Sequence, residues 1–390
     1  MKKPFFWLLM LLSCWTLAAF AEQKQTICLN MIVKNESKVI RRCLASVGPY
    51  IDYWVIVDTG SSDGTQDIIR EFMKDVPGEL HECPWVNFSH NRNEALEFAK
   101  GKSDYVLFID ADEELKFSDG FVMPYLDIDC YSFRIEYGIS SYKRTQLVNN
   151  HLDWKWIGVV HEYIKSPQVK TVETLKGVVN VVRREGCRSQ DKDIFLKDAQ
   201  ILEAALKEDP NDARSAFYLA QSYRDAHDFK TALEKYEARV KMGGWDQEIF
   251  LAKYEIGRMQ QLLDYDTETF TKSYCEAYLC RPTRMEPLFQ IASHYRKKGN
   301  FFMGFIFSAL GLEHPVPDDQ GYVEEWIYDY GLLLEHAICT YWIGNYEESL
   351  ESCSKLLTKP HLPDNFRDHI QKTKTLVLAK LYPVGETSAK

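Results

Sequence analysis

The chain has 390 residues, of which 45% are hydrophobic and 27% are charged, and its formal net charge is −10. This is the composition of a globular protein, and the length is sufficient for two domains. The excess of acidic residues, without any cluster of lysine and arginine interleaved with aromatic side chains, excludes nucleic acid as a main partner.

The N-terminal residues have the pattern of a targeting segment. Two lysines precede an apolar stretch over residues 5–20, and residues 19–21, Ala-Phe-Ala, match the cleavage signature of secretory leaders. The apolar stretch is also borderline in length for a membrane span. We therefore predict a signal peptide or membrane anchor over residues 1–21 and an exported or membrane-associated protein, which is cytoplasmic only if the leader is not used.

Residues 26 to about 185 alternate between strand-like and helix-like stretches. In chain order, the pattern predicts a strand over 26–33, a helix over 37–47 capped by Ser37, a strand over 53–60, a helix over 65–73, a helix over 92–101 and a strand over 105–110. Strands that alternate with helices are typical of a mostly parallel sheet covered on both faces. Ligands of such sheets bind at the carboxyl ends of the strands.

Four carboxylates follow the apolar run of the last predicted strand, those of Asp110, Asp112, Glu113 and Glu114. Residues i and i+2 of an extended chain point the same way, so Asp110 and Asp112 can direct both carboxylates at one cation. Mg²⁺ binds few protein oxygens and shares its remaining positions with water and substrate phosphates. An isolated D-x-D motif is more often a turn former or a helix cap, but its position at a predicted strand end favours a metal–diphosphate site.

A second acidic loop follows the second predicted strand. Within VDTGSSDGT, residues 57–65, Asp58 ends the strand and Asp63 can face back toward it, because two glycines allow a tight reversal. Carboxylates in this place can accept hydrogen bonds from a base N–H and from ribose hydroxyls. The G-x-G-x-x-G fingerprint of dinucleotide-binding domains is absent from the loop.

From about Ser189 onward the strand pattern is replaced by a helical repeat. Matches to the small and aromatic positions of the tetratricopeptide motif cover residues 215–240 and 288–312, with weaker copies near 256–257 and over 337–353. The spacing of the copies scatters around the ~34 residues of that motif, so the array is degenerate. We predict two directly packed domains, over residues 26–188 and 189–382.

Four motifs follow one another along the first domain: VKNESKVIRRCLASV from residue 33, VIVDTGSSDGT from residue 55, HNRNEAL from residue 90 and YVLFIDADEEL from residue 105. In this order and spacing they resemble the family 2 glycosyltransferases of GT-A fold, in the subgroup with C-terminal tetratricopeptide repeats. The resemblance continues through WKWIGVVHEYI, from residue 154, into the repeats. It implies an α/β GT-A-type nucleotide-diphospho-sugar transferase domain followed by an all-α tetratricopeptide-like repeat domain.

The resemblance implies a metal-dependent, inverting hexosyltransferase that moves a sugar from a nucleotide-sugar donor, expected to be a UDP-sugar, to a hydroxyl of a glycan, lipid or protein. The positions that match the donor nucleotide-binding residues are Asn35, Glu36, Asp58, Asp63, Arg92, Asn93 and Asp110. Those that match the Mn²⁺ or Mg²⁺ site are Asp110, Asp112 and His161, with Asp112 as the direct ligand. The candidates for the catalytic base are Glu162 and Asp153, with Glu113 and Glu114 behind them.

Several alternatives are open at this point. His161 can also hydrogen-bond a phosphate, or be a packed or capping side chain. A nucleotidyltransferase would use the same nucleotide and cation but would release pyrophosphate instead of a nucleoside diphosphate. A peptide-binding repeat module with a degenerate transferase domain is a third possibility, although a dead site has little reason to keep clustered carboxylates. Because the transferase region is short, the repeats are expected to complete the acceptor site or to bind a protein partner.

Overall fold

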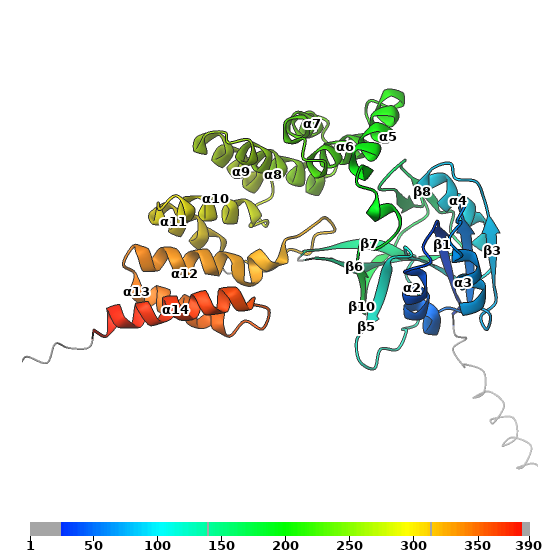
Figure 1. The fold of residues 1–390 in the computed structure, drawn as a ribbon, viewed down its shortest axis with the longest axis horizontal. Coiled ribbons are helices and arrows are strands. Elements are labelled where there is room, and N and C mark those ends of the chain that lie inside the picture. The colour runs from blue at the N-terminus through cyan, green and yellow to red at the C-terminus, as the bar shows by residue number, and fades with distance from the viewer. Residues whose placement is uncertain (1–24, 139, 313, 384–390) are drawn as a thin grey trace, which may run out of the picture.

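The structure is a computed structural model that describes residues 25–138, 140–312 and 314–383, so the predicted leader over residues 1–21 lies outside the described residues. The chain forms a sheet domain followed by an array of helices (Figure 1). The last strand ends at Val182 and the first long helix of the array begins at Ile194, with a connecting segment between them. Within the described ranges, no helix is long and apolar enough to cross a membrane.

The sheet domain contains one large sheet with the strand order β3-β2-β1-β4-β7-β6-β10-β5. The strands are β1 Ile27–Val33, β2 Tyr53–Asp58, β3 Gly78–Glu82, β4 Tyr105–Phe108, β5 Glu113–Phe117, β6 Cys130–Tyr137, β7 Ser140–Asn149 and β10 Val172–Val182. Strands β3, β2, β1 and β4 pair in parallel, β7 runs antiparallel to β4 and β6, and β10 is parallel to β6 but antiparallel to β5. The predicted class, a mostly parallel sheet followed by helical repeats, is confirmed.

Both faces of the parallel strands are covered. Helices α2 Ile40–Val47 and α3 Thr65–Phe72 pack on one face, and helix α4 Phe88–Ala99 packs on the other beside the hairpin of β8 Lys155–Ile157 and β9 Tyr163–Lys165. Alternate residues of β1 serve the two cores, because neighbouring side chains of a strand point to opposite faces. Leu29 lies in the core beneath α2, and Cys28 lies in the core beneath α4.

Two of the predicted helix boundaries are wrong. The helix expected over 37–47 starts only at Ile40 and has no side-chain cap. Ser37 lies in a preceding turn, in which the N–H groups of Val39 and Ile40 bond the carbonyl of Glu36. The helix expected from residue 92 starts earlier, at Phe88, because the side chain of Asn87 accepts a hydrogen bond from the first turn and caps it. The cap at Asn87 is a local one, made to the N–H of His90 three residues farther along.

The helical array begins beside the sheet domain and curves away from it (Figure 1). Its helices are α5 Ile194–Glu208, α6 Ala213–Asp225, α7 Phe229–Lys241, α8 Asp246–Leu262, α9 Thr267–Cys280, α10 Glu286–Lys297, α11 Phe301–Gly311, α12 Leu332–Trp342, α13 Tyr346–Leu357 and α14 Asp364–Leu381. Glycines at the motif positions let neighbouring helices approach closely. A Cβ at Gly257 would lie 2.7 Å from the ring of Tyr274, and one at Gly304 would lie 2.6 Å from the sulfur of Cys339.

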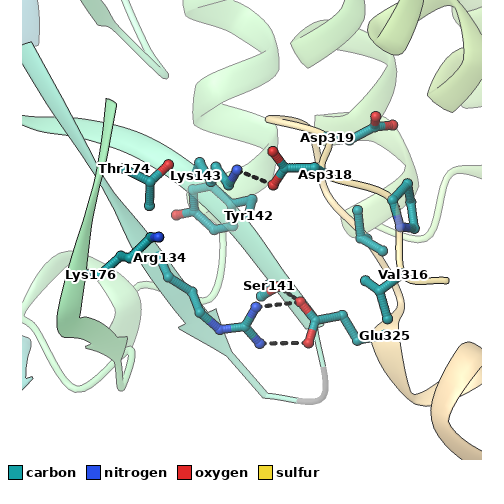
Figure 2. Close-up of a pocket in the computed structure, with 12 residues that line it drawn as sticks. Arg134, Ser141, Tyr142, Lys143, Thr174, Lys176, Val316, Asp318, Asp319 and Glu325 are labelled. Carbon is teal, nitrogen blue, oxygen red and sulfur yellow. Dashed lines mark hydrogen bonds and ion pairs between the residues drawn. The ribbon is translucent and has the colours of Figure 1, made fainter. Parts of the chain in front are cut away.

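The helical array contacts the sheet domain through α6 and through the segment between α11 and α12. Helix α6 contacts the segment between β8 and β9, where Arg214 donates to the backbone carbonyl of His161. Farther along, the segment between α11 and α12 returns to the tip of the β6–β7 hairpin (Figure 1). There Arg134 and Glu325 form two hydrogen bonds beside a cavity of about 380 Å³ lined by both domains (Figure 2). None of the predicted site residues lines this cavity.

Candidate functional site

The predicted site residues at the carboxyl edge of the sheet come from three parallel strands. Val33, at the end of β1, is in register with Asp58, at the end of β2, so the loops that follow them are neighbours. Strand β4 lies on the other side of β1, and its chain continues into Asp110. The strand pairing therefore brings the loop at residues 34–37, the loop at residues 59–64 and the D-x-D motif to one edge.

Asp58 offers an unused acceptor at this edge. Its Oδ1 accepts hydrogen bonds from the backbone N–H groups of Gly60 and Ser61, at 2.9 and 2.7 Å. Its Oδ2 is buried and has no hydrogen-bond partner among the described residues. Buried polar atoms are almost always paired, so this oxygen fits a ligand that brings an N–H or a hydroxyl group.

Asn35 and Asp63 tie the two loops together. Asn35 adopts a left-handed backbone conformation, with φ of 57°, and its Oδ1 accepts a hydrogen bond from the N–H of Ser62 at 2.8 Å. Asp63 accepts hydrogen bonds from Thr65 and from the N–H of Ser37. Burial opposes ionisation of Asp63, but these hydrogen bonds outweigh it and lower its pKa to about 2. Both residues therefore shape the loops around Asp58.

The two carboxylates of the D-x-D motif have different surroundings. Asp110 accepts a hydrogen bond from Arg92 Nη2 at 2.6 Å and forms a longer ion pair with Arg144 at 3.7 Å. Burial opposes ionisation of Asp110, but these guanidinium groups outweigh it and lower its pKa. The Asp112 carboxylate accepts a hydrogen bond of 3.1 Å from the backbone N–H of Gly186, in the segment that connects the two domains.

Glu36 joins Asp112 in a cluster of negative charge. Its carboxylate accepts two 3.2 Å hydrogen bonds from the N–H of Cys187. Burial, reinforced by the charge of Asp112, raises the pKa of Glu36 to about 7, although the Cys187 N–H opposes the shift. Burial also raises the pKa of Asp112. A Cβ at Gly186 would lie 2.9 Å from Asp112 and 3.2 Å from Glu36, so only a glycine fits between the two carboxylates without displacing them.

This cluster fits a cation that is shared with a ligand. When two carboxylates disfavour each other's ionisation, a nearby positive charge stabilises their ionised forms and lowers their pKa values. Within the part of the chain that the structure describes, no group of three or more His, Cys, Asp or Glu side chains is arranged to hold a metal ion by itself. Mg²⁺ commonly takes one or two carboxylates and completes its coordination with substrate phosphates, and the residues present match that mode.

Arg92 connects the D-x-D motif to Glu162. Helix α4 carries Arg92 into the site, where its side chain is 10% exposed and its guanidinium lies over the ring of Trp156 at 5.0 Å. Its Nε donates to Glu162 Oε1 at 2.6 Å, while its Nη2 contacts Asp110. One buried guanidinium therefore holds both a D-x-D carboxylate and a predicted catalytic base.

His161 faces the helical array. Its ring stacks on Tyr218 of α6, with centroids 4.1 Å apart and planes 12° from parallel. Desolvation by the surrounding protein, together with the positive charges of Arg188 and Arg214, lowers the pKa of the imidazole, so the ring is neutral near pH 7. Because no three such side chains among the described residues are arranged to hold a metal ion, the predicted set of Asp110, Asp112 and His161 is not assembled.

Two further predicted residues have other roles in the structure. Asp153 lies beside Trp154, whose indole bonds the carbonyl of Asn149, and Asn149 pairs with the first residue of β4. Asp153 is thus at the opposite end of the sheet from the D-x-D motif and is not a base for this site. Asn93 uses both atoms of its side-chain amide on the backbone of Trp156, at 3.0 and 2.9 Å, and so clamps β8 to α4.

The remaining acidic candidates are structural. Glu113 is buried and accepts hydrogen bonds from Arg144 at 2.5 Å and Asn180 at 2.8 Å, and Glu114 pairs with Arg183 at 2.5 Å. Of the predicted bases, Glu162 is the one that Arg92 links to Asp110.

Sequence reasoning missed several residues of the site. They are Arg144 on β7, Gly186 and Cys187 in the connecting segment, and Arg214 and Tyr218 on α6. Each reaches the site through long-range packing, which no local pattern reports. The one usable signal was the basic stretch RREGCR, residues 183–188, at the end of the first predicted domain.

Comparison with known proteins agrees with this geometry. The model of the family described as glycosyl transferase family 2 matches residues 28–119, which contain both acidic loops, Arg92 and the D-x-D motif. This part of the chain is similar to glycosyl transferase family 2. The family 2 match ends before His161 and Glu162, so the role of Glu162 rests on its contact with Arg92.

Curated relatives are similar to a short part of the chain. A TPR repeat-containing protein of Synechococcus elongatus is 41% identical over 90 residues, which is 23% of this chain and 21% of that protein. The glycosyltransferase SunS of Bacillus phage SPbeta is 42% identical over 88 residues, which is 22% of this chain and 20% of that protein. The chain thus matches about a fifth of the length of these relatives.

Solved structures are similar over larger parts of the chain. The crystal structure of MamA covers 46% of this chain and 93% of its own, with 14% identity and a TM-score of 0.35. The crystal structure of Staphylococcus aureus TarS covers 63% of this chain and 54% of its own, with 13% identity and a TM-score of 0.32.

Proposed function

We propose that the protein is a glycosyltransferase that moves a hexosyl group from a nucleotide-sugar to a hydroxyl group of a glycan, lipid or protein acceptor, with inversion at the anomeric carbon. The observation that carries this proposal is the bridge formed by Arg92. A single guanidinium contacts both Asp110 and Glu162, so a diphosphate held at the D-x-D motif would lie beside a carboxylate able to accept a proton.

The donor nucleotide is the ligand that best satisfies Asp58. The free Oδ2 of this residue would accept a hydrogen bond from a base N–H or a ribose hydroxyl. Asn35 and Asp63 support the donor indirectly, because their hydrogen bonds fix the loops on either side of Asp58. A UDP-sugar is the donor that the resemblance to family 2 enzymes leads us to expect, and the N–H of its uracil would suit this oxygen.

A divalent cation would be held by Asp112 together with Glu36 and the donor phosphates. When bound, Mn²⁺ or Mg²⁺ neutralises the charge that develops on a departing nucleoside diphosphate. The raised pKa values of Glu36 and Asp112 support this assignment, because both carboxylates ionise more readily beside a positive charge.

The chain's own residues then account for proton transfer and orientation. Glu162 accepts the proton of the acceptor hydroxyl as that oxygen forms a bond to the anomeric carbon. The bond from the anomeric carbon to the donor phosphate oxygen breaks on the opposite side, which inverts the configuration. Arg92 orients the Glu162 carboxylate and keeps it beside Asp110.

The test is product analysis with the full chain and a panel of nucleotide sugars in the presence of Mn²⁺. We expect release of a nucleoside diphosphate from one donor, lost in EDTA and in Asp112→Asn. Glu162→Gln should bind nucleotide normally and lower kcat on the order of 10²-fold or more. Glu351→Gln, an exposed change on α13, is the matched control and should behave as wild type.

Two results would contradict the proposal. Release of pyrophosphate from a nucleoside triphosphate would identify a nucleotidyltransferase. No turnover of any donor, with no nucleotide raising the melting temperature, would favour a binding protein.

A further inference from the structure

We propose that Arg214 and Tyr218, on helix α6 of the helical array, are positioning residues that hold Glu162 in place for proton transfer. This inference rests on the proposed function, in which Glu162 is the base. It assigns a part of the catalytic arrangement to the second domain, outside the segment that matches family 2.

The segment that carries Glu162 needs support from outside itself. It connects β8 and β9, and two of its residues adopt left-handed backbone conformations, Gly158 with φ of 105° and His161 with φ of 54°. A non-glycine residue in this conformation is strained and persists where the surroundings hold it there. His161 directly precedes Glu162, so whatever enforces its conformation also aims the Glu162 side chain.

Helix α6 supplies the enforcing contacts on both sides of Glu162. Arg214 donates two hydrogen bonds to the carbonyl of His161, at 2.9 Å from Nη2 and 3.2 Å from Nε. The His161 ring stacks on Tyr218 at 4.1 Å. The guanidinium of Arg214 also lies over the ring of Tyr163 at 4.9 Å. The residues before and after Glu162 are therefore both held by the helical array.

The two residues of α6 form a single rigid unit. Positions four apart lie on the same face of a helix, and Arg214 Nη2 donates to the Tyr218 hydroxyl at 3.3 Å while its guanidinium lies 4.8 Å over the Tyr218 ring. The start of α6 is fixed by Asp212, whose Oδ1 accepts from the N–H groups of Arg214 and Ser215, each at 3.1 Å. Arg214 thus leaves the first turn of the helix in a defined direction.

From the sheet domain, the Glu162 carboxylate is held by Arg92. That contact fixes one oxygen but leaves the backbone of the segment free to shift. Displacement of a reacting group by about 1 Å can lower a rate on the order of 10²-fold. Contacts from α6 to the backbone and rings of the flanking residues prevent such a shift. Glu162 needs this fixed position in order to meet an acceptor hydroxyl.

The experiment compares three variants of the full chain, with the donor identified by the panel above. Tyr218→Ala removes the ring beneath His161 and should lower kcat on the order of 10-fold to 10²-fold, while the donor KM and the nucleotide Kd change less than about twofold. Tyr218→Phe keeps the stacking and should restore kcat to within about threefold of wild type. Tyr295→Ala removes a half-buried tyrosine from α10 and controls for general destabilisation of the array.

The outcomes separate this inference from the proposed function. If wild type turns over and Glu162→Gln does not, the proposed function stands, and a Tyr218→Ala variant with normal kcat then overturns the positioning role alone. Equal losses of kcat in Tyr218→Ala and Tyr295→Ala, following equal losses of melting temperature, also overturn it. If wild type transfers no sugar, the proposed function fails and the positioning role fails with it.

Discussion

Single residues at the carboxyl edge of the sheet show how strongly the site depends on a positive partner. Glu36 and Asp112 accept backbone hydrogen bonds from neighbouring residues of one short segment, Cys187 and Gly186. Backbone N–H groups carry only partial charges, so they do not replace a cation. The pKa values of both carboxylates are therefore raised, which favours proton uptake. Measurements of stability against pH can detect this uptake.

A pH-dependent stability follows from Glu36. Its folded-state pKa of about 7 lies above the ordinary value of 4.5, so the folded protein binds this proton more tightly than the unfolded chain does. The stabilisation that results is fully present below about pH 4.5 and is lost as the pH rises through 7. In EDTA, Glu36→Gln should therefore be more stable than wild type at pH 8, by no more than ~3 kcal/mol, and the difference should vanish near pH 4.5.

Thermal or denaturant unfolding of both proteins across this pH range checks the prediction. The amide oxygen of glutamine can still accept from Cys187, so the variant isolates the charge. A constant difference between the two proteins at every pH would mean that Glu36 does not take up a proton in the folded state. At pH 8, saturating Mn²⁺ should stabilise wild type more than Glu36→Gln, because only the carboxylate gains a partner.

At the scale of elements, the site is held in place by hydrogen bonds between neighbouring helices and strands. The residues that make these hydrogen bonds need not take part in the reaction. Asn93 on α4 brackets the backbone of Trp156 on β8, which sets the hairpin that precedes Glu162. Resemblance to family 2 enzymes predicts the same asparagine near the donor diphosphate. The two interpretations differ in a measurable way, because a clamp affects stability and a ligand contact affects affinity.

We expect Asn93→Ala to lower the free energy of unfolding by about 1–3 kcal/mol, because it leaves buried backbone groups of Trp156 without partners. The nucleotide Kd should change less than about twofold. Asn150→Ala is the control, since Asn150 likewise donates to two backbone carbonyls, those of Ala99 and Ser103, at the far end of the sheet. Unchanged stability with about tenfold weaker nucleotide binding in Asn93→Ala would restore the donor-contact role.

Some helices and strands could be predicted from the sequence and others could not. The strands β1, β2 and β4 and the helix α3 were predictable because their apolar patterns and turn residues are local, and the strand ends then located Asp58 and the D-x-D motif. Strands β6, β7 and β10 carry no such regular pattern, so Arg144 was missed. Asp153 was misassigned because it is near Glu162 along the chain. In the structure it lies at the opposite end of the sheet from the D-x-D motif.

At the scale of the whole molecule, two separate junctions join the domains within the part of the chain that the structure describes. The first is the contact of α6 with the segment around Glu162. The second joins the β6–β7 hairpin to the segment between α11 and α12, through Arg134, Ser141 and Glu325 (Figure 2). Because the first junction touches the site and the second does not, they should contribute differently to activity and to stability.

A double-mutant cycle measures the second junction. The Arg134–Glu325 pair has bidentate geometry, with one contact of 2.6 Å, but its side chains are 42% and 27% exposed, so screening limits its strength. We expect a coupling free energy of about 1 kcal/mol between Arg134→Ala and Glu325→Ala, reduced in 1 M salt, with kcat within about twofold of wild type. The exposed Arg70–Glu82 pair, 3.3 Å apart, is the control and should couple less. No measurable coupling would mean that the other contacts of this junction, such as the backbone pairing of Ser141 with Val323 and the Lys143–Asp318 pair, carry it without this ion pair.

The return of the segment between α11 and α12 to the sheet also constrains how the molecule can change over evolution. An open solenoid can gain or lose a repeat, because each unit contacts only its neighbours. Here the stretch from α6 to α11 spans two fixed points on one body, so inserting or deleting a helical pair would pull one end off its anchor. Among the described residues beyond Glu325, helices α12 to α14 have no second anchor on the sheet domain. Variation in repeat number should therefore be confined to the C-terminal side of that anchor, where the array can grow without disturbing the site.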